Sequence, residues 1–304
     1  MEDDGLRDRY RGVLLGMAAG DALGATLEFM SRAEIRERYG VHREIIGGGW
    51  LNLPPGEVTD DTQMASCIAR SIADQGRFDP ADVAAHFVDW YHSHPPDIGN
   101  TTRRSLEYLA QGVPWDEAGL RTHRELRPRD ASNGSLMRCA PVALYARRNP
   151  AANAQHSADS SRITHANPIA VDACVAYNAA LAALLDNPRA DFLAAALAAA
   201  GEPEVRAALE EAPRADPDQL PAGGHVIATV RAATWAVLTH DSFEEAVVAA
   251  VNLGQDADTT GAVAGAFAGA RWGLAAIPAR WQDALLAREE LIDLADGLRE
   301  LSER

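Results

Sequence analysis

Two short acidic clusters in this 304-residue sequence combine residue types that could do metal chemistry. Each pairs two carboxylates with neighbouring hydroxyls: Thr59, Asp60, Asp61 and Thr62 in "GEVTDDTQMA", and Asp256, Asp258 and Thr259 in "VNLGQDADTTGA". Like charges this close are unfavourable unless a cation offsets them. Hard oxygen ligands suit Mg²⁺, Mn²⁺ or Ca²⁺ rather than zinc, which prefers His or Cys. The clusters therefore predict divalent-cation binding, with a two-metal site as one form of it.

A purely structural role for the same residues stays open. Aspartate at the start of a helix is favoured by the helix dipole and by capping, and each cluster precedes an apolar segment. One aspartate at each place would need no other reason. Two adjacent aspartates do, because the dipole does not remove their mutual repulsion.

The elements that must position the clusters contain regularly spaced glycines. Glycines recur every four residues at positions 12, 16, 20 and 24, and again at 261, 265 and 269. This step places each set on one face of a helix, although a glycine inside a helix costs about 1 kcal/mol relative to alanine. Close packing of helix backbones is one explanation. A sharper one is that the two helices cross near each other and bring their acidic ends together.

The remaining segments read as helices joined by loops, without alternating strand patterns or a fixed repeat. Residues 210–224 are polar and rich in Pro, and we expect them to form a mobile loop. We predict one all-α domain spanning residues 1–304. Helix start and stop signals predict one helix from Thr62 to Gly76 and another after Asp79-Pro80. They also predict that residues 100–102 cap the next helix and that a further helix begins near Leu136.

Composition excludes several classes of protein. The net charge of −16 argues against a nucleic-acid partner bound through a basic surface, but metal ions in an acidic site can still attract an anion. Three scattered cysteines indicate reduced thiols and a cytoplasmic location. The charged N-terminus lacks a signal-peptide pattern, and no apolar stretch reaches about 18 residues uninterrupted, so no membrane span is expected. A monomer is the favoured oligomeric state.

Six segments, in this order along the chain, resemble one known family: "GMAAGDALGATLEF", "PGEVTDDTQMA", "DIGNTTRRSL", "NGSLMRCAPVAL", "SRITHANP" and "NLGQDADTTGAVAGAFAGARWG". They are similar to the ADP-ribosylglycohydrolases, which include dinitrogenase reductase-activating glycohydrolases and ADP-ribosylarginine hydrolases. The resemblance extends from about Tyr10 to Trp281. It implies a compact all-α fold with a binuclear Mg²⁺ centre, or Mn²⁺ in its place, at the base of a cleft.

The resemblance also assigns roles to individual residues. The implied metal ligands are Thr59, Asp60, Asp61, Asp256, Asp258 and Thr259. Glu28, at the end of "GDALGATLE", would lie beside the metals as a ligand, a general base, or both in turn. Asp97 would lie near the reaction centre, where its carboxylate could hold a guanidinium leaving group. A helix-capping role for Asp97 is an equal alternative, and Asp21 is expected to orient ligands from a buried position.

Substrate contacts are implied on three segments. The residues concerned are Gly99, Asn133, Gly134, Ser135, Met137 and His165. If a helix follows Ser135 directly, backbone amides at its start could face a phosphate. His165 would contact the ADP-ribose part, with a capping or core role as the alternative.

Three nearby residues carry separate expectations. Arg138 is more simply explained as a structural ion-pair partner than as a substrate contact. His225 stands where relatives often have an aromatic residue that can stack on adenine. Gln255 stands where many have glycine, and it could narrow the cleft or point away from it.

These features favour a metal-dependent hydrolase that cleaves the N-glycosidic bond between ADP-ribose and an arginine side chain of a modified protein. Glu28 would activate water or carry its proton, and an acidic group would protonate the leaving nitrogen. Another linkage is the main alternative: serine, O-acetyl-ADP-ribose or a nucleobase. A protein that binds ADP-ribose without catalysis is a third reading, although every acidic position is present.

Overall fold

The computed structural model describes residues 2–127 and 131–304, and within these ranges it contains helices and loops but no β-strand. Two isolated bridges, Gly48 to Leu53 and Ser132 to His225, join loops. The predicted all-α class is confirmed. The helices are α1 (Glu2–Gly24), α2 (Arg32–Tyr39), α3 (Asp60–Gln75), α4 (Pro80–His92), α5 (Asn100–Ala110), α6 (Trp115–Leu126), α7 (Ala140–Ala146), α8 (Pro150–Arg162), α9 (Pro168–Asp186), α10 (Phe192–Ala199), α11 (Pro203–Glu211), α12 (Val226–Thr239), α13 (Phe243–Val251), α14 (Ala257–Trp272), α15 (Ala279–Ala284) and α16 (Arg288–Ser302), with single 3-10 turns η1 (Ala212–Arg214) and η2 (Leu274–Ala276).

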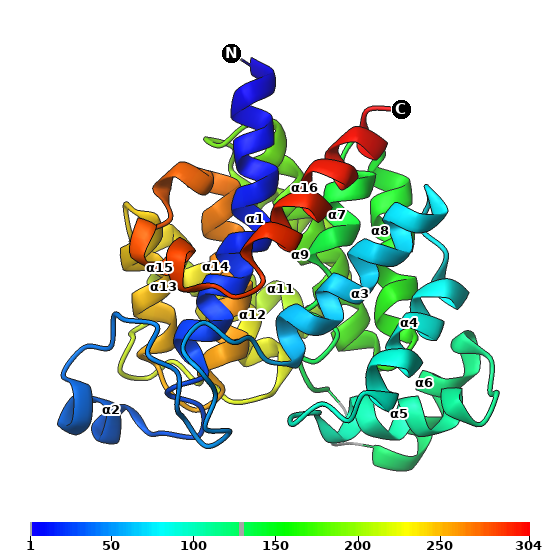
Figure 1. Cartoon of the computed structure of the whole chain (residues 1–304), viewed down its shortest axis with the longest axis horizontal. Helices are drawn as coiled ribbons and strands as arrows, with labels where there is room; N and C mark the ends of the chain where they lie inside the picture. Colours follow the sequence, from blue (N-terminus) through cyan, green and yellow to red (C-terminus); the bar gives the residue numbers. More distant parts are fainter. Residues whose placement is uncertain (1, 128–130) are drawn as a thin grey trace.

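Helices α1 and α14 pack backbone to backbone in the centre of the molecule (Figure 1). A Cβ atom added to Gly12 would lie 2.6 Å from the carbonyl oxygen of Gly269, and one added to Gly20 would collide with the carbonyl of Gly261. Gly24 faces Ala257 in the same way, so the helices run antiparallel. Both glycine predictions are confirmed. The close packing places the C-terminal end of α1 beside the acidic N-terminus of α14.

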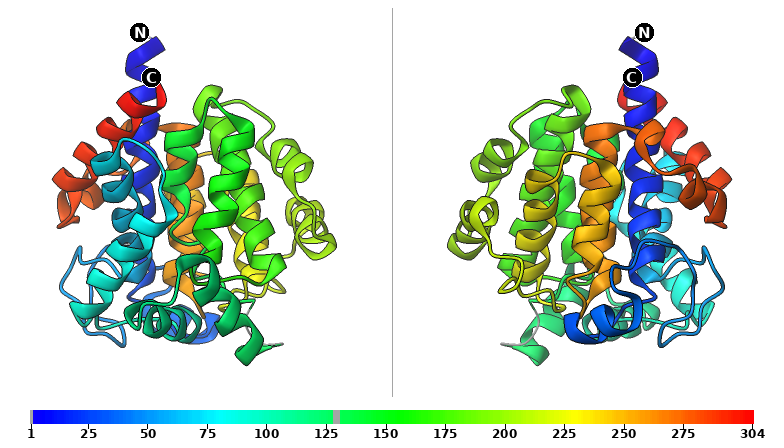
Figure 2. Two further views of the ribbon diagram at one scale, coloured as in Figure 1. Left: turned by 90° about the vertical axis from the view of Figure 1, so that its right-hand side faces the viewer. Right: turned by 90° about the vertical axis from the view of Figure 1, so that its left-hand side faces the viewer.

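The two termini lie at one end of the molecule, and the loops that follow α1 and precede α5 lie at the opposite end (Figures 1 and 2). The antiparallel pair therefore carries the chain from the terminal end to the loop end and back. Both acidic clusters stand where helices meet these loops, since α3 begins at Asp60 and α14 at Ala257.

The starts of α3 and α5 differ from the predictions. Helix α3 begins at Asp60, two residues before Thr62, and it ends at Gly76 in the left-handed conformation as expected. Helix α5 begins at Asn100 after Gly99, and no side chain caps it. Residues 100–102 are thus its first turn, and their predicted capping role is wrong. The helix predicted after Pro80 is confirmed, with Asp79 as its cap.

The segment from Asn133 to Cys139 is a series of turns, and α7 begins only at Ala140. The backbone amides of Leu136 and Met137 both donate to the carbonyl of Asn133, at 2.8 and 3.1 Å. The predicted helix start near Leu136 is wrong. No helix therefore starts directly after Ser135, and the first-turn amides that were expected to face a phosphate are not found there.

Helix α9 is long and apolar enough to cross a membrane by length and composition, contrary to the sequence-based expectation. Two thirds of the apolar window (67%) is nevertheless buried inside the protein. Tyr177 of α9 packs edge-on against Phe267 of α14, with ring centroids 4.5 Å apart. Figure 2 shows α9 among the packed helices, and we interpret it as a core helix.

Residues 210–224 comprise the end of α11, the 3-10 turn η1 and then an irregular stretch that leads to α12. His225 caps α12, with its Nδ1 accepting from the amide of Ile227 at 3.3 Å. The loop prediction is confirmed from Ala215 onward, whereas the segment before it is the end of α11 and η1. Its mobility stays a prediction.

Candidate active site

A cleft of about 460 Å³ opens at the loop end of the α1–α14 pair. Every residue that the resemblance implies as a metal ligand, a catalytic group or a substrate contact lines it, except Thr59 and Ser135. The lining residues are Glu28, Phe29, Trp50, Asp60, Asp61, Asp97, Ile98, Gly99, Asn100, Thr101, Thr102, Ser132, Asn133, Gly134, Met137, His165, Gly224, Asp256, Asp258 and Thr259. The two acidic clusters, far apart in sequence, thus meet in one cleft.

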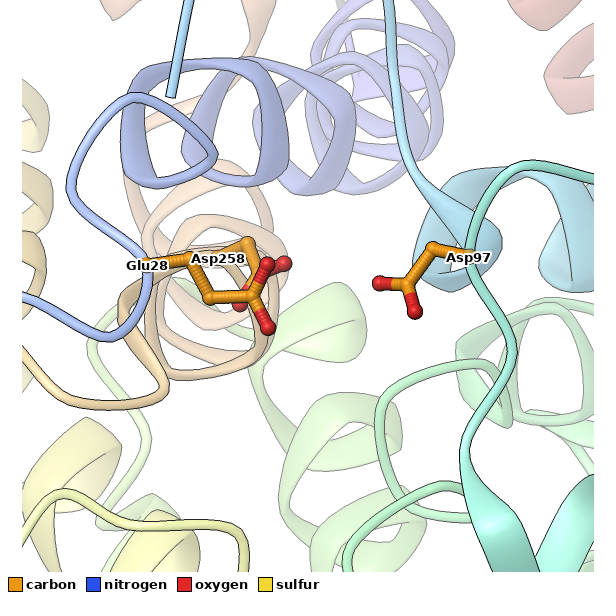
Figure 3. A group of neighbouring side chains, drawn as sticks. All are labelled: Glu28, Asp97 and Asp258. Carbon is orange, nitrogen blue, oxygen red and sulfur yellow. The ribbon is translucent and has the colours of Figure 1, made fainter. Parts of the chain in front are cut away.

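Three carboxylates from separate elements converge there. Glu28 lies in the loop after α1, Asp97 in the loop before α5, and Asp258 in the first turn of α14. One oxygen from each lies within 4.8 Å of one from the other two. Figure 3 shows Glu28 and Asp258 together, with the Asp97 carboxylate pointing toward them across the cleft. This geometry suits cation binding, proton transfer, or both.

Asp60, Asp61 and Asp258 are nearly inaccessible to solvent, with exposed fractions of 7%, 1% and 2%. Burial, followed by repulsion from neighbouring carboxylates, raises the pKa of each well above its ordinary value. Asp61 Oδ1 is buried without a hydrogen-bond partner. Among the lining residues that the structure describes, none is a lysine or arginine. A hard divalent cation would satisfy the orphaned oxygen and offset the repulsion, so the residues present fit such an ion.

Asp21 lies behind the first cluster, fully buried. It accepts hydrogen bonds from the backbone amide and hydroxyl of Thr59, at 3.1 and 2.9 Å, and from those of Thr62, at 3.2 and 2.6 Å. Burial raises the pKa of Asp21 to about 6, although these hydrogen bonds oppose the shift. Asp21 thereby fixes the start of α3 and the orientation of Asp60 and Asp61. This arrangement matches its expected orienting role.

Thr59 is buried at the start of α3. Its hydroxyl lies 2.9 Å from Asp21 and 3.2 Å from Asp61 Oδ2. The hydroxyl group thus links the orienting carboxylate to a cluster carboxylate. Its role as a metal ligand stays a prediction.

Glu28 contacts a residue that the sequence analysis did not single out. The indole N–H of Trp50 donates to Glu28 Oε2, and the Trp50 ring lies 5.4 Å from that of Phe29. Burial raises the pKa of Glu28 to about 7; the Trp50 hydrogen bond opposes this, and Asp97 and Asp256 add to it. The available sequence signal was a tryptophan directly after three glycines in a Gly/Pro-rich loop.

Asn133, Gly134 and His165 form another wall of the cleft. Asn133 Nδ2 donates to Asp256 Oδ2 at 2.8 Å and to Thr229 Oγ1 at 2.9 Å. The buried His165 ring packs against Gly134 and lies within hydrogen-bond distance of Ser132 and Thr164. Burial, reinforced by nearby Arg138, holds the pKa of His165 well below its ordinary value. His165 is therefore neutral near pH 7 and can position a polar ligand without adding charge.

Ser135 and Arg138 point into the protein. Ser135 is buried and its hydroxyl bonds to that of Ser161 at 2.8 Å. Arg138 is fully buried, donates to Thr164 Oγ1 at 2.5 Å and lies 4.4 Å from the Phe87 ring centroid. It forms no ion pair within residues 2–127 and 131–304, so the expected ion-pair role is not observed there. Burial lowers the pKa of Arg138 to about 10.

His225 and Gln255 do not line the cleft. His225 is exposed and occupied as the cap of α12. Gln255 is exposed and has a positive φ of 61°, and its backbone bonds to the chain at Phe29 and Met30. Of the two alternatives for Gln255, the structure supports the one in which it leaves the cleft free.

Comparison with known proteins identifies the family. A family model described as ADP-ribosylglycohydrolase matches residues 2–304. The chain belongs to the ADP-ribosylglycohydrolase family. It is therefore an enzyme of the glycohydrolase class, in agreement with the sequence-based resemblance.

Two curated relatives are similar over most of their length. The ADP-ribosyl-(dinitrogen reductase) glycohydrolase of Rhodospirillum rubrum is 36% identical, over 92% of this chain and 91% of the relative. The ADP-ribosylarginine hydrolase Tri1 of Pseudomonas putida (strain GB-1) is also 36% identical, over 96% of this chain and 78% of the relative. A solved structure, an ADP-ribosylglycohydrolase-related protein complex, superimposes with a TM-score of 0.85 and 38% identity, over 98% of this chain and 99% of that one.

Proposed function

We propose that the protein hydrolyses the N-glycosidic bond between ADP-ribose and an arginine side chain of a modified protein, and that it requires divalent cations. The convergence of Glu28, Asp97 and Asp258 in one acidic cleft carries this proposal. Two relatives similar over most of this chain are named for ADP-ribosylarginine or ADP-ribosylated reductase substrates. The accumulated negative charge suits both a guanidinium leaving group and the cations that would receive a diphosphate.

The proposed cofactor is two Mg²⁺ ions, or Mn²⁺ in their place. Bound cations would supply positive charge against the ribose and diphosphate and would make water in the cleft more acidic. The residues that would hold them are Thr59, Asp60, Asp61, Asp256, Asp258 and Thr259. The orphaned Asp61 oxygen and the burial of three carboxylates support this set.

In the proposed reaction Glu28 accepts the proton of the attacking water. Its pKa of about 7 suits a group that must exchange protons near neutrality. Asp97 faces Glu28 and Asp258 across the cleft, where its carboxylate can hold the guanidinium in a paired hydrogen bond. A protonated acid then donates to the departing nitrogen. Asn133, Gly134, Met137, His165 and Gly99 line the space left for ADP-ribose.

We also propose a reducing cytoplasmic setting and a monomeric enzyme whose partner is the ADP-ribosylated protein. All three cysteines, Cys67, Cys139 and Cys174, are buried free thiols, which suits a reducing compartment. The net charge of −16 disfavours nucleic acid as a partner.

The test is release of ADP-ribose from an arginine-ADP-ribosylated protein with Mg²⁺, with Mn²⁺ and with EDTA. Asp256→Ala removes one acidic side chain of the cleft, and the exposed Asp241→Asn serves as the charge-matched control. We expect turnover that needs metal, disappears in Asp256→Ala and persists in Asp241→Asn. Metal binding without arginine-linked turnover would instead favour a serine, O-acetyl or nucleobase linkage. Absence of metal binding would refute the metal site.

A further inference from the structure

The mouth of the acidic cleft carries two exposed aromatic side chains. Phe29 is 66% and Trp50 is 50% exposed, and both line the cleft. Their ring centroids lie 5.4 Å apart at an interplanar angle of 54°. Burial in the core does not explain their position, because both rings remain largely in contact with solvent.

The backbone holds Phe29 in an unfavourable conformation. Its φ is +64°, a region that bulky residues rarely adopt. Two hydrogen bonds maintain it: the Phe29 amide donates to Gln255 O at 2.6 Å, and the Gln255 amide donates to Met30 O at 2.7 Å. Gln255 precedes the second acidic cluster, so these bonds tie the Phe29 backbone to that cluster.

Trp50 is held from the other side. The Thr26 hydroxyl donates to the carbonyl of Gly47 at 2.9 Å, and Gly49 packs against the carbonyl of Ala25. These contacts attach the loop to the end of α1. The Trp50 indole N–H then donates to Glu28. The aromatic ring and the carboxylate thus form one fixed unit at the cleft mouth.

We propose that Phe29 and Trp50 form the subsite for the arginine side chain of the substrate, with the guanidinium on the aromatic surface beside Glu28. The proposal rests on the proposed arginine-linked activity. A cation over an aromatic face is attracted by the ring quadrupole, and nearby Glu28 and Asp97 add charge complementarity. A neutral leaving group gains neither attraction. The pair therefore selects a cationic acceptor.

Direct binding tests the subsite without turnover. The probes are agmatine, a guanidinium without the carboxylate of arginine, and N-carbamoylputrescine, in which a neutral ureido group replaces the guanidinium and the terminal ammonium is kept. Both are titrated calorimetrically in saturating Mg²⁺. We expect agmatine to bind more tightly than N-carbamoylputrescine, because only agmatine carries a charged guanidinium end. Trp50→Ala and Phe29→Ala should each weaken agmatine binding about two- to fivefold, as expected for one exposed cation–π contact. Trp50→Phe should retain binding, and the matched control Ile46→Ala lies exposed in the same loop but outside the cleft lining.

Kinetics then separate selection from other roles of the rings. The ratio of kcat/KM for ADP-ribosylarginine to that for ADP-ribosylserine should fall about two- to fivefold in Trp50→Ala, with the Kd for ADP-ribose unchanged. Weaker ADP-ribose binding would mean that the rings stack on the base, and would overturn the proposal. An equal loss of kcat/KM on both substrates would mean that Trp50 only supports Glu28. This result would also overturn the proposal.

Failure of the two proposals can be distinguished. If the wild type does not hydrolyse arginine linkages, the proposed function fails, while the agmatine titration still decides the subsite. Agmatine binding that Trp50→Ala does not change, or no agmatine binding at all, would overturn the subsite whatever the activity. Circular dichroism of each variant confirms that the protein is folded.

Discussion

Asp21 on α1 accepts a 2.6 Å hydrogen bond from the hydroxyl of Thr62 on α3, and through it the central helix fixes the first acidic cluster. Asp21→Asn keeps the shape but loses the charge and replaces one acceptor oxygen by a donor. We expect a loss of about 1–3 kcal/mol in the free energy of unfolding, measured in urea. Weaker Mg²⁺ binding by calorimetry should accompany it. Unchanged values for both would show that Asp21 does not position the cluster.

The α1–α14 contact should not tolerate a side chain. Gly20→Ala places a Cβ against the carbonyl of Gly261, and we expect it to destabilise the protein by about 1–3 kcal/mol, because two backbones must separate. Gly297→Ala is the matched control, since Gly297 lies within α16 and its Cβ would meet nothing within 4 Å. The control should be stabilised by about 0.5–1 kcal/mol. Equal effects in urea unfolding would contradict the packing argument.

Neutralising one cluster carboxylate should have opposite effects without and with metal. Burial, and then repulsion from neighbouring carboxylates, raises the pKa of Asp60, so in EDTA we expect Asp60→Asn to be more stable than the wild type. In Mg²⁺ the wild type should become more stable because the folded state binds the cation. Asp60→Asn should lack this stabilisation by Mg²⁺. Thermal unfolding measures both. Destabilisation of the metal-free variant would contradict the repulsion argument.

The metal-free protein should also become less stable as pH rises. The folded-state pKa values of Asp21 and Glu28, about 6 and about 7, lie above their ordinary values of 3.8 and 4.5. The folded state therefore binds more protons than the unfolded state between about pH 4 and 7. The stabilisation that Asp21 and Glu28 contribute to the folded state consequently decreases as the pH rises through that window. Thermal unfolding in EDTA from pH 4 to 7.5 tests the sign. Excess Mg²⁺ should reduce the effect because cations favour the ionised carboxylates.

Glu28→Gln should reduce kcat by at least about 10²-fold, because an amide cannot accept the proton of water. In the wild type the indole hydrogen bond from Trp50 lowers the pKa of Glu28. Trp50→Phe removes this bond and should therefore shift the acidic limb of the pH–rate profile to higher pH. The profile of kcat/KM from pH 5 to 9 measures the shift. A shift to lower pH would contradict the role given to that bond.

The sequence by itself determined which carboxylates occur in pairs and which helix faces can approach closely. Adjacent aspartates indicate a cation because their repulsion is local, and a four-residue glycine step indicates backbone packing because the helix period is fixed. The all-α class, the end of α3 at Gly76 and the meeting of the two clusters followed from such local rules. These properties depend on covalent neighbours and on the geometry of one helix.

Only the tertiary structure decided the rest. The Asn133 side chain donates to Asp256, and its carbonyl accepts hydrogen bonds from the amides of Leu136 and Met137. This segment therefore remains non-helical although its local sequence pattern favoured a helix. Phe29 reaches the cleft because its amide donates to Gln255, which is distant in the sequence. Trp50 reaches the cleft because its indole N–H donates to Glu28, which lies on another segment. Hydrogen bonds between segments far apart in the chain leave no local periodicity. For that reason the shape of the cleft mouth could be known only once the helices had been packed together.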